Sequence, residues 1–144
     1  MSIAVVYWSG TGNTRTMAEA VGRGIALAGE EAEIIFVDQA DVSKIAEGEV
    51  IALGCPSMGA EELEETEMEP FIQKLEGKVT GKKLLLFGSF GWGDGEWMRI
   101  WEKRMKEAGA VLIGDSGVVA NEAPGEEALR ACENAGKALA EAVK

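Results

Sequence analysis

Short apolar runs recur along the chain, separated by segments in which apolar residues stand three or four positions apart. The runs predict β-strands over 3–8, 33–38, 50–55, 83–90 and 111–119. "IAVVYW" and "VIALGC" are apolar at successive positions, which is typical of strands buried on both faces of a sheet. Helical spacing predicts helices over 14–29, 41–47, 70–77, 95–108 and 125–143.

Strands that alternate with helices predict an α/β fold, a doubly wound parallel sheet with helices on both faces. A chain of 144 residues is the size of a single domain, so we expect one domain over 1–144. Ligands of such folds bind beyond the carboxyl ends of the strands. The segments to inspect are therefore the loops at 8–14, 55–62, 88–97 and 119–125.

Composition indicates a soluble cytoplasmic protein. The apolar fraction of 47% excludes disorder, and no apolar run is long enough to cross a bilayer. No charged segment precedes "IAVVYW", so we expect no secretory signal. Cys55 and Cys132 do not form a disulfide framework, and both are expected in the core or in helix packing.

The net charge is −11, from 25 acidic and 14 basic residues, which argues against binding to nucleic acid. The charge suits either docking to basic proteins or solubility alone. The chain has no histidine, which excludes histidine catalysis and histidine metal sites. Two distant cysteines make zinc and iron–sulfur sites untenable, so we expect no metal.

The segment "YWSGTGNTRTM" connects the first strand to the first helix and has the composition of an anion site. Its glycines let backbone N–H groups approach a ligand, and the helix N-terminus adds unpaired N–H groups. No Lys or Arg stands between Ser9 and Thr14. A Walker A loop needs Gly-Lys-Ser/Thr, and the dinucleotide fingerprint needs glycine at Arg15. A plain turn capped by Asn13 or Thr14 remains the alternative.

Two further loops carry residues suited to a flat ligand. Met58 and Gly59 follow the third strand, and Trp92 lies between Gly91 and Gly93 after the fourth. A tryptophan on a glycine-rich loop offers a stacking surface. A core methionine and an exposed surface tryptophan are the alternatives. Trp97 and Trp101, four apart on a predicted helix, are expected in the core.

With these loops, the sequence resembles the flavodoxins, and most closely the short-chain subclass typified by clostridial and other anaerobe proteins. The resemblance covers nearly the whole chain and rests on "YWSGTGNT", on "LGCPSMG" with "EELEE", and on "LFGSFGWGDGEWM". It implies a five-stranded sheet in the order 2-1-3-4-5 and a single FMN-binding domain. It also implies a low-potential one-electron carrier, not an enzyme, that shuttles FMN between semiquinone and hydroquinone.

The resemblance also implies the cofactor contacts. The FMN phosphate would be bound by Ser9, Thr11, Gly12, Asn13 and Thr14. Met58 and Trp92 would flank the flavin ring, with Glu61 accepting a hydrogen bond from its N3. Ser89 and Asn121 would lie near the ribityl chain. The remaining implied contacts come from the same loops: Gly10, Ser57, Gly59, Ala60, Phe90, Gly91 and Gly93. Arg15 stands where relatives often have glutamate.

By the same resemblance, the peptide between Gly59 and Ala60 turns over on reduction. A turn with positive φ at Gly59 suits the starting conformation. The charge run "EELEETEME" can be a solvated face. As a hypothesis, its side chains oppose negative charge on the reduced ring: Glu61, Glu62, Glu64, Glu65 and Glu67. The absence of a cation from the phosphate loop fits the same hypothesis, because a lysine there would stabilise negative charge on the reduced ring.

We expect a monomer whose partners are redox proteins, namely ferredoxin-type oxidoreductases, hydrogenases and reductases, with no nucleic acid or membrane partner. Two alternatives share the fold: an FMN-dependent NAD(P)H:quinone reductase and a flavodoxin-like activator of ribonucleotide reductase. A phosphorylation receiver domain is rejected, because it needs acidic residues after the first and third strands. Those places hold Trp8-Ser9 and Gly54-Cys55.

Overall fold

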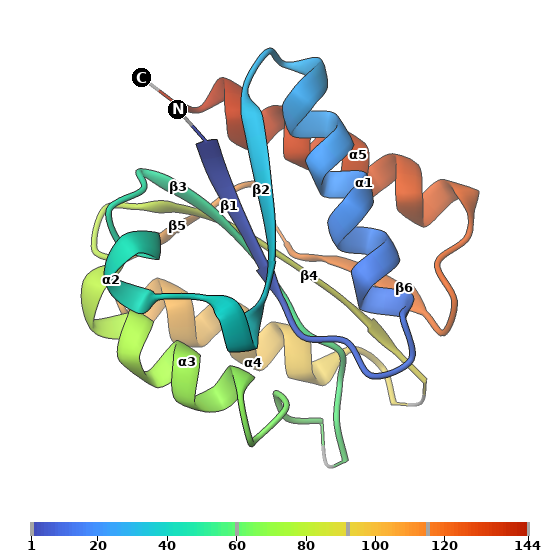
Figure 1. Cartoon of the computed structure of the whole chain (residues 1–144). Helices are drawn as coiled ribbons and strands as arrows, with labels where there is room; N and C mark the ends of the chain where they lie inside the picture. Colours follow the sequence, from blue (N-terminus) through green and yellow to red (C-terminus); the bar gives the residue numbers. More distant parts are fainter. Residues whose placement is uncertain (1, 60, 92, 115, 144) are drawn as a thin grey trace.

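The computed structural model of the chain describes residues 2–59, 61–91, 93–114 and 116–143. Its centre is a parallel sheet in the order β2-β1-β3-β4-β5, with β6 also paired to β4 (Figure 1). The strands are β1 (Ser2–Tyr7), β2 (Glu31–Phe36), β3 (Val50–Gly54), β4 (Lys83–Phe90), β5 (Val111–Leu112) and β6 (Val118–Asn121). The predicted fold class and strand order are confirmed.

Helices cover both faces of this sheet, as predicted. α1 (Asn13–Leu27) and α5 (Glu126–Glu141) lie side by side on one face (Figure 1). The other face carries α2 (Val42–Ile45), α3 (Met68–Leu75) and α4 (Glu96–Glu107). Short 3₁₀ turns follow β2 and α3, at Val37–Gln39 and Glu76–Lys78. Among the described residues, no helix is both long and apolar enough to cross a membrane.

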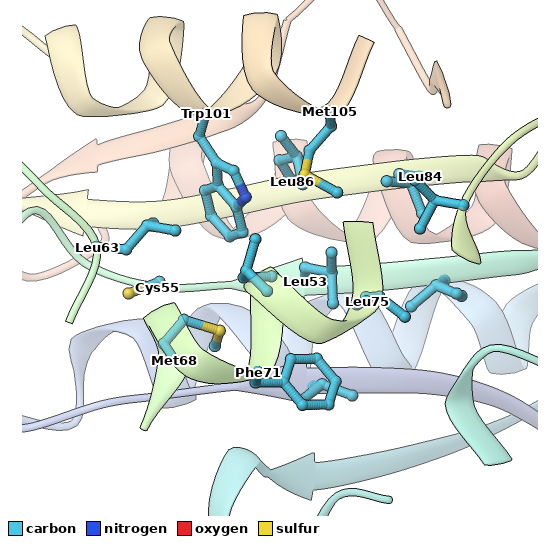
Figure 2. Packing of buried hydrophobic residues seen from close by; sticks show 14 of the residues in the cluster. Leu53, Cys55, Leu63, Met68, Phe71, Leu75, Leu84, Leu86, Trp101 and Met105 are labelled. Atoms are coloured by element: carbon cyan, nitrogen blue, oxygen red, sulfur yellow. The ribbon is translucent and has the colours of Figure 1, made fainter. Parts of the chain in front are cut away.

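The strands read as continuous apolar runs because alternate residues enter different cores. Ile51 and Leu53 of β3 pack with α3 and α4, whereas Val50 and Ala52 belong to the core under α1 and α5. Burying one such side chain contributes about 1.5–3 kcal/mol. Figure 2 shows the α3/α4 core, in which Trp101 reaches down from α4 toward β3 and β4.

Both tryptophans of α4 are buried, as the sequence predicts, but they differ in their polar contacts. The indole Nε1 of Trp97 donates to the carbonyl of Cys55 at 3.1 Å. Nε1 of Trp101 is buried without a hydrogen-bond partner among the described residues, so Trp101 serves the core through the packing of its ring. Cys55 and Cys132 are buried free thiols in the two cores, also as predicted.

The fifth predicted strand, 111–119, is interrupted in the structure. β5 pairs with the start of β4, and β6 pairs with its end, from Phe87 to Phe90. Leu112 pairs with Leu84 and Val118 pairs with Phe87, so only Leu85 and Leu86 of β4 separate the two paired segments. Just before β6, Gly117 lies so close to Met98 that an added Cβ would be 2.5 Å from the Met98 sulfur. The prediction of one continuous strand was therefore wrong.

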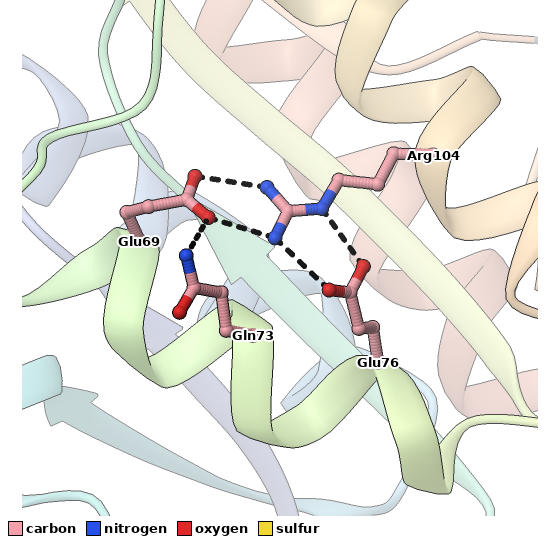
Figure 3. A network of polar contacts seen from close by, with 4 residues as sticks. All are labelled: Glu69, Gln73, Glu76 and Arg104. Carbon is pink, nitrogen blue, oxygen red and sulfur yellow. Dashed lines mark hydrogen bonds and ion pairs between the residues drawn. The ribbon is translucent and has the colours of Figure 1, made fainter.

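An arginine clamp joins α3 to α4 (Figure 3). The guanidinium of Arg104 donates to both carboxylate oxygens of Glu69 at 2.8 Å, and its Nε donates to Glu76 at 2.9 Å. Gln73 adds a hydrogen bond to Glu69 at 3.1 Å. Hydrogen bonds from Arg104 hold the pKa of Glu69 below its usual value, against the opposing effect of burial. The clamp fixes the start and end of α3 against α4.

Candidate functional site

The loops that follow β1, β3 and β4 gather at one end of the sheet (Figure 1). In the first loop, Gly12 has a φ of 99° and ends the loop directly before Asn13. Its N–H donates to Ser9 Oγ at 3.0 Å. Within the described chain, no side chain caps α1, so its first N–H groups are free to hold an anion. The alternative of a cap at Asn13 or Thr14 is wrong.

Two buried hydroxyls connect the first loop to the sheet. Thr14 Oγ1 and Ser89 Oγ lie 3.2 Å apart, and the two residues are only 1% and 5% exposed. A hydroxyl donates one hydrogen bond and accepts up to two, so each retains capacity for a ligand after this contact. The contact fixes the start of α1 against the end of β4, at the place where the resemblance puts a phosphate and a ribityl chain.

The second loop is a short hairpin. Met58 and Glu62 exchange backbone hydrogen bonds of 2.9 and 3.0 Å, and Ser57 N–H continues the β3–β4 pairing by donating to Ser89 O at 3.0 Å. Gly59 has the positive φ that the sequence predicts, 46°. Glu61 also has a positive φ, 57°, which is unusual for glutamate and was not predicted. Ala60 lies outside the described residues.

Glu61 reaches across from the second loop to the third. Its Oε1 accepts the backbone N–H of Glu96 at 3.1 Å, at the start of α4. The backbone of Gly93, with a φ of 86°, lies so close that an added Cβ would be 2.8 Å from the same oxygen. Glycine at 93 is favoured by its positive φ, and a larger residue there would also displace the Glu61 carboxylate. Trp92 lies outside the described residues.

A cavity of about 340 Å³ opens between the three loops. Its lining includes many of the predicted cofactor residues: Ser9, Gly10, Thr11, Asn13, Thr14, Ser57, Met58, Ser89, Phe90 and Gly91. Gly12, Gly59, Glu61 and Gly93 belong to the same loops without lining the cavity. Asn121 instead lines a separate cavity of about 420 Å³ between β6 and α5.

The structure adds Trp8, Pro56 and Glu122 to the lining. The ring of Trp8 covers Gly10, because an added Cβ there would lie 3.0 Å from Trp8 Cη2. The Trp8 indole N–H donates to Glu67 Oε1 at 3.2 Å. Glu122 has a φ of 57°, and its N–H donates to Phe90 O at 2.7 Å. Trp8 was missed because it ends an apolar run and reads as strand core.

The described lining residues include Glu122 but no lysine or arginine. Arg15, directly after the first loop, lies outside this lining with its side chain 65% exposed. Its Nε lies 3.5 Å from Glu19 Oε2, one turn further along α1. The expectation of a cation-free loop therefore holds for the described part of the cavity.

The charge run after the hairpin is not a uniform solvated face, which corrects the sequence expectation. Glu62 and Glu65 are exposed, but Glu64 is only 5% exposed. Its carboxylate accepts the backbone N–H groups of Thr66, Glu67 and Met68 at 2.9, 2.8 and 3.0 Å, and also the Thr66 hydroxyl. Burial acts to raise the pKa of Glu64, and these hydrogen bonds outweigh it, so the pKa is lowered.

We expect acid to destabilise the protein through Glu64 and Glu69. Both have folded-state pKa values below the ordinary 4.5. Their contribution to the free energy of unfolding is therefore complete above pH 4.5 and is lost as the pH falls through the lower folded-state values. Urea unfolding at a series of pH values should show the free energy of unfolding falling below about pH 4.5. The fall should be shallower in Glu64→Gln than in Glu65→Gln. Equal slopes in the two variants would contradict this assignment.

The chain is similar to known proteins over nearly its whole length. A family model described as Flavodoxin matches residues 5–136. The flavodoxin of Clostridium beijerinckii is 45% identical over 136 residues, which cover 94% of this chain and 97% of that protein. The solved structure of two-electron reduced Megasphaera elsdenii flavodoxin is 44% identical, with a TM-score of 0.89 over 97% of this chain and 99% of that one. An archaeal flavodoxin structure, 31% identical, matches with a TM-score of 0.88 over 98% of this chain and 97% of that one.

Proposed function

The chain belongs to the flavodoxin family, and on that premise we propose that its FMN lies in the cavity between the loops at 8–14, 55–62 and 88–97. The protein is an FMN-binding electron carrier rather than an enzyme. FMN, when bound, supplies the redox chemistry by taking up and releasing single electrons. The chain supplies binding, orientation and the electrostatic environment.

The phosphate end of FMN fits the first loop. The uncapped start of α1 presents N–H groups and the positive end of the helix dipole to the cavity. Hydrogen bonds to a charged acceptor contribute about 1.5–3 kcal/mol each, so several hold a phosphate without a cation. The proposed ligands are Ser9, Gly10, Thr11, Gly12, Asn13 and Thr14. The buried Ser89 hydroxyl extends this polar surface toward the ribityl chain.

The ring end of FMN fits the two glycine-rich loops. Met58 lines the cavity on the hairpin side, and Gly91 lines it on the side that leads into Trp92. We propose Met58 and Trp92 as the residues that flank the ring, with Ser57, Gly59, Ala60, Glu61, Phe90 and Gly93 shaping the two loops. A volume of about 340 Å³ is ordinary for a small-molecule site. We keep Asn121 as a proposed FMN contact, because it is paired in the sheet with Phe90, which lines the cavity.

The charges near the cavity favour a low potential. Glu122 in the lining and the exposed Glu62 and Glu65 raise the free energy of any negative charge added inside. At about 10 Å and an effective dielectric constant of about 20, each contributes about 1.7 kcal/mol before screening. No described lysine or arginine in the lining offsets them. The chain therefore opposes complete reduction of the bound cofactor.

The observation that carries this proposal is the uncapped start of α1, which opens on a cavity whose described lining holds no lysine or arginine. It is tested by titrating the FMN-free protein with FMN and then reducing the complex stepwise without oxygen. We expect one FMN per chain and two separate one-electron steps, the first marked by a long-wavelength band that disappears in the second. A folded protein that takes up no FMN overturns the proposal. Steady oxidation of NADPH by the loaded protein alone would favour the quinone reductase alternative. Electron transfer to one dedicated partner only would favour the activator of ribonucleotide reductase.

We further propose that residues 1–144 act as a single FMN-binding domain, as a monomer in the cytoplasm. Its partners would be redox proteins, including ferredoxin-type oxidoreductases, hydrogenases and reductases. The net charge of −11 supports docking to basic surfaces, where complementary charge mainly accelerates encounter. The acidic residues beside the cavity would then face the partner.

A further inference from the structure

Glu64 lies at the centre of the segment that joins the hairpin to α3. Each oxygen of its buried carboxylate accepts two hydrogen bonds. Oε1 accepts the N–H groups of Glu67 and Met68 at 2.8 and 3.0 Å, and Oε2 accepts the Thr66 N–H at 2.9 Å and the Thr66 hydroxyl. Charge-assisted hydrogen bonds of this kind are roughly twice as strong as neutral ones. The carboxylate thus sets the path of the chain into α3.

The backbone of Glu64 is also held in place. Its N–H donates to Cys55 Sγ at 3.3 Å, directly after β3. Cys55 is fixed in turn, since its N–H donates to Phe87 O at 3.1 Å and its carbonyl accepts the Trp97 indole at 3.1 Å. Glu64 therefore connects the segment to the rigid end of the sheet and to α4.

Both walls of the cavity depend on this segment. Two residues before Glu64, Glu62 forms the backbone pair that holds Met58 in the hairpin. Three residues after it, Glu67 has its N–H bound by Glu64 and its own carboxylate bound to the Trp8 indole. Met58 and Trp8 both line the cavity, on different loops. The Glu64 carboxylate thus holds the support of Trp8 directly, and Glu64 holds that of Met58 through the chain that joins it to Glu62.

We propose that Glu64 is a positioning residue for FMN, which holds Met58 and Trp8 in register across the cavity. The exposed side chains of Glu62 and Glu65, in contrast, would act only through their charge. The inference rests on the proposed FMN site. A site whose supporting residues are fixed before binding avoids the cost of ordering them when the ligand enters.

Glu64→Gln tests this role with little change in size. The glutamine carbonyl can keep the hydrogen bonds from Glu67 and Met68, but the amide NH₂ then faces the N–H of Thr66, and two donors oppose each other. Glu65→Gln removes the same charge from the exposed neighbouring position. Both variants lose one negative charge. A difference in FMN affinity between them therefore reports the positioning role of Glu64.

The experiment is FMN binding by the FMN-free forms of both variants, at a temperature where circular dichroism shows each to be folded. We expect the dissociation constant for FMN to rise about tenfold in Glu64→Gln, the factor that corresponds to one lost charge-assisted hydrogen bond. Glu65→Gln should bind as tightly as the unchanged protein or more tightly. The NMR resonance of the Trp8 indole N–H, assigned through Trp8→Phe, should move in Glu64→Gln and stay in place in Glu65→Gln.

Equal FMN affinity in the two variants, or an unmoved Trp8 resonance, would overturn the positioning role and leave the FMN site intact. Failure of the unchanged protein to bind FMN would overturn the proposed function instead. If Glu64→Gln does not fold, Thr66→Ala replaces it, with Thr66→Ser as its control. Thr66 is exposed, and its hydroxyl donates to Glu64. Thr66→Ala should weaken FMN binding about threefold relative to Thr66→Ser, and equal affinities of this pair overturn the proposal.

Discussion

Gly24→Ala is expected to destabilise the protein by about 3 kcal/mol, the upper end of the usual range for overpacking a core. The same change stabilises most helix interiors by about 1 kcal/mol, because glycine is a poor helix former. The opposite sign is expected here because α1 and α5 approach each other through glycines. A Cβ on Gly24 would lie 1.9 Å from the backbone oxygen of Glu133 in α5.

The close approach is reciprocal. A Cβ on Gly136 of α5 would lie 2.1 Å from the backbone oxygen of Val21 in α1. Backbone atoms of a helix cannot turn away as the end of a side chain can, so an added methyl group must push the two helices apart. That separation would open the core beneath them, where Met17, Val21 and Leu139 are fully buried.

Gly22→Ala is the matched control, in the same helix and two residues away. Its Cβ would meet side chains and no backbone: Ile34 Cδ1 at 2.7 Å, Ile34 Cγ1 at 3.3 Å and Ala32 Cβ at 3.6 Å. Ile34 is exposed enough to rotate. We expect stability that is unchanged or up to about 1 kcal/mol higher. Urea unfolding followed by circular dichroism measures both variants. Equal stability of the two would contradict the close helix contact.

The layer architecture could be predicted because it follows from run length and period alone. Each strand in the middle of the sheet sends alternate residues into two cores, so its sequence is apolar throughout, as in "VIALGC". The interruption of 111–119 could not be predicted from the same signal. It depends on how Gly117 packs against Met98 of α4, and nothing in "VLIGDSGVV" states which helix will lie there.

The candidate site likewise has one part that could be predicted from the sequence and one part that could not. The first loop could be predicted because its chemistry lies in a few adjacent residues, from Ser9 to Thr14. The role of Glu64 could not, because "EELEETEME" contains several glutamates of equal standing, and only folding buries one of them against Cys55. Trp8 was hidden for a related reason, since its partner Glu67 is 59 positions away.

The last prediction concerns the cation-free first loop. Our hypothesis is that leaving the phosphate charge without a cation helps to keep the potential of bound FMN low. Thr11→Lys should therefore bind FMN and raise the more negative of its two one-electron midpoint potentials. One added charge at about 10 Å, with an effective dielectric constant of about 20, corresponds to about 1.7 kcal/mol or about 70 mV before screening. Thr11 is suited to the change because it lines the cavity and is exposed.

Ser2→Lys is the control, because it adds the same charge at the opposite end of β1. Six strand residues span about 20 Å, roughly twice the distance over which 0.1 M salt screens exposed charges. Anaerobic redox titration of the two loaded variants at that ionic strength measures the difference. A rise confined to Thr11→Lys, and larger at lower salt, would mean that the missing cation contributes to the low potential. Equal potentials in both variants would mean that the loop lacks a cation only because its N–H groups and hydroxyls suffice to bind the phosphate, and the potential would then be set by Glu122 and the other acidic side chains beside the cavity.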